Sequence, residues 1–210
     1  PFISFQGPWQ SFARFGVVDR REFWNGVSYD MNSAFVFGQF RPRSGLNINM
    51  QINRGEQIDY TNSRLADQRR YQPQIDWNAT RHLLVRLRYT SDHLMRKDGA
   101  TIFHAKVTDL RLTWQFNVRS FVRLTLQDQD IDRNLAAYED PDNDPSTPPP
   151  VLPPERTKTL ASQLLYSYKL NPQTVLFAGY SDNSVEDVTT REMEKTGRTL
   201  FFKLSYAWTP

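Results

Sequence analysis

The sequence lacks cysteine entirely, and it has only three histidines and nine glycines in 210 residues. Without cysteine there is no disulfide, no zinc–thiolate site, no thiol catalysis and no c-type haem attachment. No apolar run reaches the roughly 18 residues of a transmembrane helix. The formal net charge of +3 is too small to indicate nucleic-acid binding. The chain begins at Pro1 without an initiator methionine or a signal segment, which predicts a processed chain or part of a longer one.

Aromatic residues are plentiful by contrast, at 13%, and apolar residues recur with a period of two. In residues 83–90 an apolar side chain occupies every odd position, with Arg86 and Arg88 between them. The same alternation recurs in residues 110–117, 122–127, 163–169 and 197–208. No comparable helical stripe occurs. The pattern predicts an all-β chain of about ten antiparallel strands.

Asp98-Gly99 is a strong signal for a two-residue hairpin turn. A turn centred there pairs apolar with apolar residues: Leu83 with Trp114, Val85 with Leu112, and Leu87 with Leu110. On the other face it pairs Arg86 with Arg111 and Arg88 with Asp109. A slip by one residue would invert every side chain, so this agreement supports the register. Turns centred on Thr80 and Arg119 extend it, and predict Trp77 opposite Leu83 and Trp114 opposite Leu124.

The connections alternate in length. Short turns are predicted near residues 41–45, 79–81, 118–120 and 171–173. Longer or more polar segments lie between them, at residues 57–69, the Asp98-Gly99 tip, 132–157 and 186–196. Segment 132–157 contains seven prolines, which predicts an extended surface loop. Short turns at one end and long loops at the other are typical of an up-and-down transmembrane β-barrel, here one domain over residues 1–210.

The apolar face of such a sheet could line a soluble core or contact lipid. Runs of about ten residues match the length that a tilted strand needs to cross hydrocarbon. Large aromatic residues near the short turns and the chain end predict an interfacial girdle: Trp77, Trp114, Tyr168 and Trp208. We therefore expect the apolar face to contact lipid, in a bacterial outer membrane.

The polar face would then line a lumen in which basic residues predominate. We expect the solute to contact Arg86, Arg88, Arg111, Arg123, Lys169 and Lys203. They outnumber Asp76 and Asp109, and excess positive charge in a pore favours anions. The structural alternative is an arginine lining that is paired internally, as Arg88 with Asp109, or covered by a plug.

Other candidate sites are weaker. His93 and His104 become cross-strand partners in the hairpin register, but no third metal ligand accompanies them. Ser91 near His93 lacks the context of a catalytic nucleophile. We therefore predict no enzyme activity, no resident metal and no cofactor.

An acidic segment in the long loop has the opening spacing of a calcium loop, at Asp140, Asp142 and Asp144. Pro145 and Val151 replace the required glycine and the closing glutamate, which excludes an EF-hand. Weak binding of divalent ions by this loop remains an alternative to a solvated tip.

The C-terminal segment from Gly197 to Trp208 resembles the closing-strand signal read by the bacterial barrel-assembly machinery, although Thr209 and Pro210 follow the tryptophan. The sequence of residues 162–172, 174–181 and 198–206 resembles that of a bacterial family of outer-membrane barrels of unknown function. Its members often carry a periplasmic module similar to carbohydrate-binding family 9. The resemblance covers about residues 160–208, supplies no catalytic residues, and implies the C-terminal part of a larger barrel.

Three functions follow as hypotheses. The first is a pore, or the membrane part of a transport or export system. The second is a non-conducting barrel that serves as a scaffold or docking platform, with loop 132–157 contacting other envelope proteins. The third is a soluble β-barrel that binds a small ligand. The expected partners are the lipid bilayer and the barrel-assembly machinery, and not nucleic acid.

Overall fold

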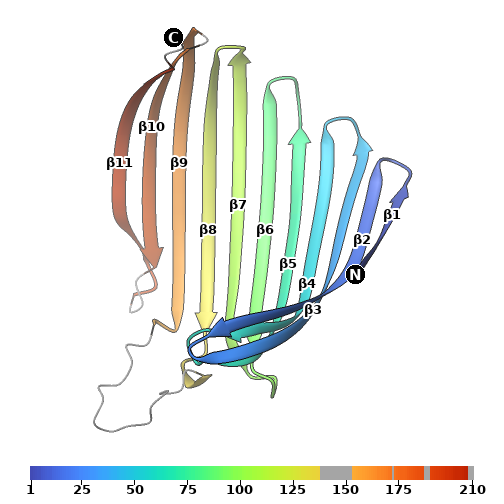
Figure 1. The fold of residues 1–210 in the computed structure, drawn as a ribbon. Coiled ribbons are helices and arrows are strands. Elements are labelled where there is room, and N and C mark those ends of the chain that lie inside the picture. Colours follow the sequence, from blue (N-terminus) through green and yellow to red (C-terminus); the bar gives the residue numbers. More distant parts are fainter. Residues whose placement is uncertain (138–152, 172, 187–189, 208–210) are drawn as a thin grey trace.

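A computed structural model describes residues 1–137, 153–171, 173–186 and 190–207 (Figure 1). Eleven strands form one antiparallel sheet in which each strand pairs with the next along the chain. The strands are β1 (Phe2–Gly7), β2 (Ser11–Trp24), β3 (Val27–Arg43), β4 (Leu46–Asp59), β5 (Arg64–Asn78), β6 (Leu83–Met95), β7 (Thr101–Asn117), β8 (Ser120–Arg133), β9 (Arg156–Asn171), β10 (Thr174–Glu186) and β11 (Met193–Tyr206). The all-β, up-and-down antiparallel fold is as predicted. In the part of the chain that the structure describes, β1 and β11 are the two edges of the sheet.

The sheet has two ends that differ in their connections. The turn end carries short turns such as residues 44–45, 79–82 and 118–119, and it lies at the top of Figure 1. The loop end carries the connections after β4, β6 and β8, including a short 3₁₀ helix, Leu135–Ala137. None of the described segments is a helix long and apolar enough to span a bilayer. The predicted loop at residues 57–69 is wrong, because β4 continues to Asp59 and β5 begins at Arg64.

The hairpin register around Asp98-Gly99 is confirmed, with Leu87 opposite Leu110 and Arg86 opposite Arg111. The other two predicted registers are wrong by two residues. Trp77 lies opposite Val85, because Thr80 Oγ1 accepts hydrogen bonds from two backbone N–H groups and holds residues 79–82 out of the ladder.

At the next turn Trp114 lies opposite Val122. Asn117 Oδ1 accepts hydrogen bonds from the backbone N–H groups of Arg119 and Ser120, which makes the turn tighter than predicted. The neighbouring Phe116 has no partner in the described ladder. Both registers differ from the predicted ones by two residues. Because side chains alternate with a period of two, each side chain keeps its predicted face.

The register separates the side chains into two faces. One row of cross-strand partners from β4 to β11 is entirely apolar: Leu46, Trp77, Val85, Leu112, Leu124, Leu164, Tyr180 and Leu200. The next row, which points to the opposite side, is entirely polar: Asn47, Asp76, Arg86, Arg111, Thr125, Gln163, Ser181 and Thr199. We call these sides the apolar face and the polar face.

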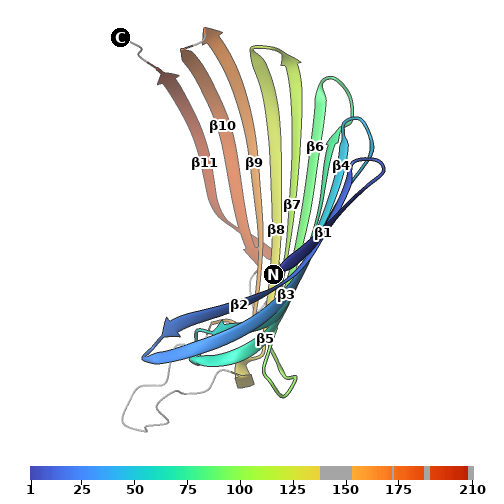
Figure 2. The same cartoon turned by 45° about the vertical axis from the view of Figure 1, so that its right-hand side comes forward.

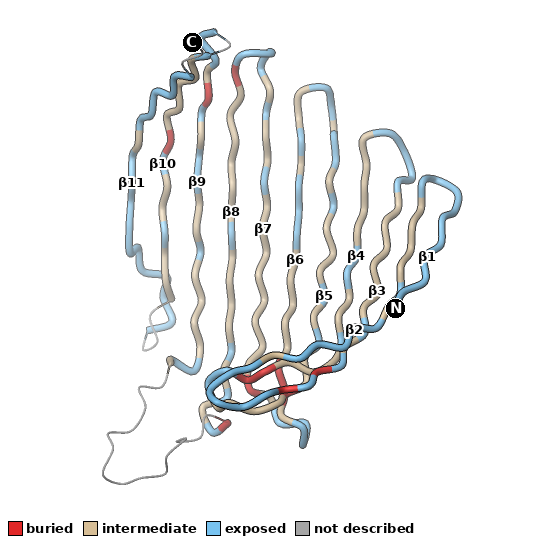
Figure 3. The backbone as a smooth tube through the Cα atoms, in the orientation of Figure 1, coloured by how far each residue is buried: buried red, intermediate tan, exposed pale blue. Residues whose placement is uncertain are grey.

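Buried apolar residues lie at the loop end and not between the long strands. One cluster contains Ala66, Leu94, Ile102 and Ala137, and a second contains Tyr29, Met31 and Ile58. Figure 3 shows these buried stretches where the ends of the hairpins cross the base of the sheet. The apolar rows across the middle therefore have no packed core of their own among the described residues.

The hairpin formed by the ends of β2 and β3, residues 20–31, folds over the end of the β4–β5 hairpin (Figures 1 and 2). Arg20 lies on the polar face opposite Met31, and its Nη2 donates to Oε1 of Gln57, on the polar face of β4, over 2.9 Å. Because polar-face side chains of the two hairpins meet, the sheet curls toward the polar face at this end. The polar face is therefore the concave one.

Candidate functional site

All six predicted basic residues lie on the polar face, although the structure does not bring all six together. Four arginines gather on three adjacent strands, and we call them the arginine patch: Arg86 and Arg88 on β6, Arg111 on β7, and Arg123 on β8. Lys169 on β9 lies opposite Val175, and Lys203 on edge strand β11 lies opposite Phe177. The two lysines therefore stand apart from the arginine patch.

The arginine patch borders a pocket of about 310 Å³ lined by Arg86, Arg88, Asp109, Leu110, Arg111 and Thr125. Arg86 forms an ion pair with Asp76. Arg111 makes no hydrogen bond or ion pair with any described residue, and Arg123 Nε is buried without a hydrogen-bond partner. The patch therefore keeps uncompensated positive charge, with guanidinium groups that suit carboxylate or phosphate oxygens.

The ion pair expected between Arg88 and Asp109 does not form. The two residues are cross-strand partners, but Arg88 Nε donates instead to Gln74 Oε1 over 2.9 Å. Gln74 is held in turn by a hydrogen bond to Asp76 of 2.5 Å. Arg88 is thus drawn toward β5, which leaves Asp109 without an ion-pair partner among the described residues.

Beside the arginine patch lies an amide-rich groove on β3, β4 and β5. It has a volume of about 410 Å³ and is lined by Phe37, Gln39, Arg41, Asn47, Asn49, Gln51, Gln72, Gln74 and Arg88. The amides offer neutral donors and acceptors, while the two arginines offer charge. A hydrophilic solute could therefore exchange its hydration for contacts along this face.

The polar face of the first strands is aromatic, which the sequence alternation did not predict. Phe12, Phe35 and Phe37 face the same side as Arg14. The Arg14 guanidinium lies 4.6 Å from the centre of the Phe2 ring and 5.3 Å from that of Phe12. These cation–π contacts keep a further positive charge on the concave side.

The predicted girdle residues Trp77, Trp114 and Tyr168 lie on the apolar face close to the turn end. Trp77 contacts the Arg43 guanidinium at 5.6 Å, and Trp114 stacks on His82 at 5.9 Å. Trp208 is outside the described residues. Aromatic rings that contact polar groups at one edge of an apolar band are typical of a membrane interface.

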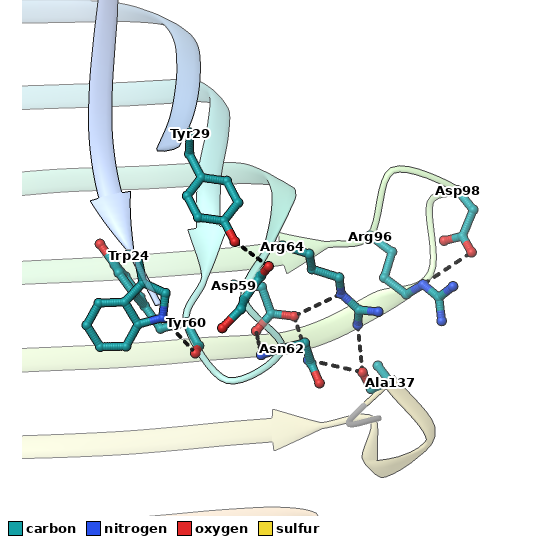
Figure 4. A network of polar contacts seen from close by, with 10 residues as sticks. Trp24, Tyr29, Asp59, Tyr60, Asn62, Arg64, Arg96, Asp98 and Ala137 are labelled. Carbon is teal, nitrogen blue, oxygen red and sulfur yellow. Dashed lines mark hydrogen bonds and ion pairs between the residues drawn. The ribbon is translucent and has the colours of Figure 1, made fainter. Parts of the chain in front are cut away.

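At the loop end, polar contacts hold the folded-over hairpin in place (Figure 4). The Trp24 and Tyr60 rings meet edge to face at 5.1 Å, and Tyr29 donates a hydrogen bond to the Ser63 carbonyl. The hydroxyl of Tyr60 donates to Glu22 Oε1 over 2.7 Å.

The β4–β5 loop is fastened to the 3₁₀ helix after β8. Arg64 Nη2 donates to the Ala137 carbonyl over 2.7 Å, and Arg64 also pairs with the buried Asp59 at 3.2 Å. We call the β2–β3 hairpin end, the β4–β5 loop and this 3₁₀ helix the cap. The cap covers part of the polar face at the loop end.

The histidine and serine candidates lie on the apolar face, one to three rows beyond the apolar residues of their own strands. His93 and His104 are cross-strand partners, as predicted, with ring centres 5.1 Å apart. Ser91 Oγ is hydrogen-bonded to Nε2 of His104 at 2.9 Å, and not to His93. The described residues contain no group of three metal-ligating side chains. Asp140, Asp142 and Asp144 lie outside the described residues.

No protein-family description and no curated protein matches the sequence. Among solved structures, the chain is similar to the NanC porin in its rhombohedral crystal form. The TM-score is 0.40 and the sequence identity is 12%, over 99% of this chain and 98% of the porin chain.

Proposed function

We propose that this chain forms the wall of a transmembrane β-barrel in the bacterial outer membrane. The barrel would act as a pore, or as the membrane part of a transport or export system, with a polar and net basic lumen. The observation that carries the proposal is the position of the apolar row on the convex face. Leu164 and Trp77, on interior strands of the sheet, remain 48% and 36% exposed there. A soluble barrel would bury such residues inside, whereas lipid covers them on the outside.

Anion preference follows from the charges on the concave face. The arginine patch carries four positive charges, and among the described residues only Asp76 and Asp109 oppose it in the same rows of the polar face. Charged rings inside a narrow passage set its selectivity. Arg111 is the strongest single candidate, because no described residue pairs with its guanidinium.

The test is conductance of the purified protein, at its full natural length, in a planar bilayer under a salt gradient. We expect stable steps with an anion-selective reversal potential. Arg111→Glu should lower the anion-to-cation permeability ratio about fivefold or more, since one unit charge at about 4 Å in water is worth about 1 kcal/mol. Arg119→Glu, in the turn at residues 118–119, is the matched control and should have a smaller effect. Equal selectivity in wild type and Arg111→Glu would contradict the assignment of Arg111 to the lumen.

The cap favours a second candidate, a barrel that does not conduct in its resting form. Its contacts cover the polar face at the loop end, where a solute would pass. This candidate predicts that the wild-type protein shows no conductance although it is folded and heat-modifiable. It also predicts that a variant that detaches the β2–β3 hairpin does conduct. Recovery of the protein from aqueous buffer as a stable monomer would contradict both.

A further inference from the structure

Two arginines face each other on the outside of the sheet, immediately beyond the apolar residues of β4 and β5. Along the apolar face the cross-strand pairs run Leu46–Trp77, Ile48–Ile75, Met50–Pro73 and Ile52–Tyr71. The next pair is Arg54–Arg69, and it is followed by Glu56–Asp67. The change from apolar to charged residues thus occurs in one step on both strands. In the proposed barrel this step marks the boundary between hydrocarbon and headgroups.

Arg54 and Arg69 have no counter-charge of their own. Both are exposed, and neither makes an ion pair or hydrogen bond with a described residue. The nearby acids Glu56 and Asp67 are both bound by Lys97, at 2.6 and 2.8 Å. Like charges directly opposite each other on neighbouring strands destabilise a sheet. An anion from outside the chain would remove this repulsion.

The arginine pair also borders a pocket. The pocket has a volume of about 390 Å³ and is lined by Arg54, Gly55, Asp67, Gln68, Arg69, Met95, Arg96, Lys97, Asp98 and Gly99. Four of these side chains are cationic and two are anionic. On β7, β8 and β9 of the same face, basic residues lie opposite acidic ones: Lys106 and Lys158 lie opposite Asp130, and Arg156 pairs with Asp130 at 2.8 Å. The excess positive charge is therefore local to β4 and β5.

We propose that Arg54 and Arg69 bind the phosphate of an anionic membrane-lipid headgroup whose acyl chains lie along Ile52 and Tyr71. The proposal rests on the proposed membrane function, because it needs the apolar face to contact lipid. Guanidinium groups are suited to phosphate oxygens, and the adjacent apolar band distinguishes a lipid from a free anion. The headgroup phosphate would act as the counter-ion that the chain itself does not supply.

The experiment uses the protein purified in a neutral detergent and titrated with dioleoyl phosphatidylglycerol, with native mass spectrometry and thermal unfolding as readouts. Wild type should retain phosphatidylglycerol about thirtyfold more strongly than phosphatidylcholine, since each of the two arginines near an anionic headgroup adds about 1 kcal/mol. Arg54→Gln/Arg69→Gln should lose this preference. In lipid-free detergent the same variant should unfold at a temperature equal to or above that of wild type, because the repulsion is gone.

Arg88→Gln/Arg111→Gln removes the same charge from the polar face and is the matched control. It should retain the lipid preference while the anion selectivity of the pore falls. Preference for phosphatidylglycerol that is unchanged in Arg54→Gln/Arg69→Gln would overturn the lipid site but not the pore. Equal stabilisation by inorganic phosphate and by phosphatidylglycerol would also overturn it, because the site would then bind a free anion. A protein that needs no detergent would overturn the proposed function instead.

Discussion

At the residue scale, the sheet places like charges opposite each other on both faces. Arg86 and Arg111 meet on the polar face, and Arg54 and Arg69 meet on the apolar face. Such pairs cost stability unless a counter-charge is present. On the polar face Asp76 neutralises Arg86 and leaves Arg111 available to a passing anion. On the apolar face no described side chain has this role, which is why the two arginine pairs suggest different ligands.

His93 offers a pH-dependent test in the same charged region, beyond the apolar rows. Burial lowers the pKa of His93 below its usual value, and the neighbouring His104 and Arg69 lower it further, while Asp92 opposes them. The unfolded chain therefore binds this proton more readily. Stability linked to His93 should be complete above pH about 6.5 and should fall as the pH drops toward the folded-state pKa.

The measurement is the NMR titration of the His93 ring, together with urea unfolding at several pH values. Arg69→Gln should raise the His93 pKa, because it removes one of the repelling charges. His93→Gln should reduce the loss of stability below pH about 6.5. A His93 pKa at or above that of a free histidine would contradict this account.

At the scale of elements, the bend that brings the β2–β3 hairpin over the sheet depends on Gly55. Pairing between β3 and β4 ends at Ser33 and Gly55, where the two backbones come very close. A Cβ atom on Gly55 would lie 2.3 Å from Ser33 Cα and 2.4 Å from the Asn32 carbonyl oxygen. Both are backbone atoms, so they cannot move aside without displacing a strand.

Gly55→Ala should therefore lower the free energy of unfolding by about 1–3 kcal/mol. It should also speed hydrogen exchange in residues 20–31, because the β2–β3 hairpin would no longer pack against the rest of the cap. Gly38→Ala in β3 is the matched control: its Cβ meets nothing within 4 Å, so we expect a change within about 0.5 kcal/mol. Equal exchange in residues 20–31 for both variants would show that the close approach at Gly55 does not hold the cap.

At the scale of the whole molecule, aromatic residues with similar exposed fractions lie in different parts of the fold. Trp77, Trp114 and Trp24 have nearly equal exposed fractions, 36%, 42% and 42%. The first two lie on the apolar face near the turn end, whereas Trp24 contacts Tyr60 in the cap. In a bilayer these positions meet different surroundings.

Fluorescence of variants that retain a single tryptophan should separate them. After reconstitution in vesicles, a bromine-labelled lipid should quench Trp77 and Trp114 at interfacial depth, and aqueous iodide should quench Trp24 more strongly. Equal quenching of all three by iodide, with none by the labelled lipid, would show that the apolar face is not in contact with lipid.

The sequence by itself determined the fold class and, for the strands after β3 apart from β10, the composition of the two faces. Alternation with a period of two is a local property of an extended chain, so the side chains of strands that alternate clearly could be assigned to a face before any partner was known. The basic residues of the polar face and the aromatic residues of the apolar face followed from it. The turn at Asp98-Gly99 also determined its own register, because the residues that close it are adjacent in sequence.

Only the tertiary structure decided which residues meet across the sheet. Side-chain hydrogen bonds in the turns at Thr80 and Asn117 set two registers that alternation cannot distinguish, since a shift of two residues preserves the faces. Residues 57–69 were predicted as a loop from their polarity. Arg54 and Arg69 are opposite each other because β4 and β5 continue into this segment, which the sequence did not predict. The cap depends on contacts between residues far apart in sequence, such as Arg64 with Ala137, for which the chain carries no local signal.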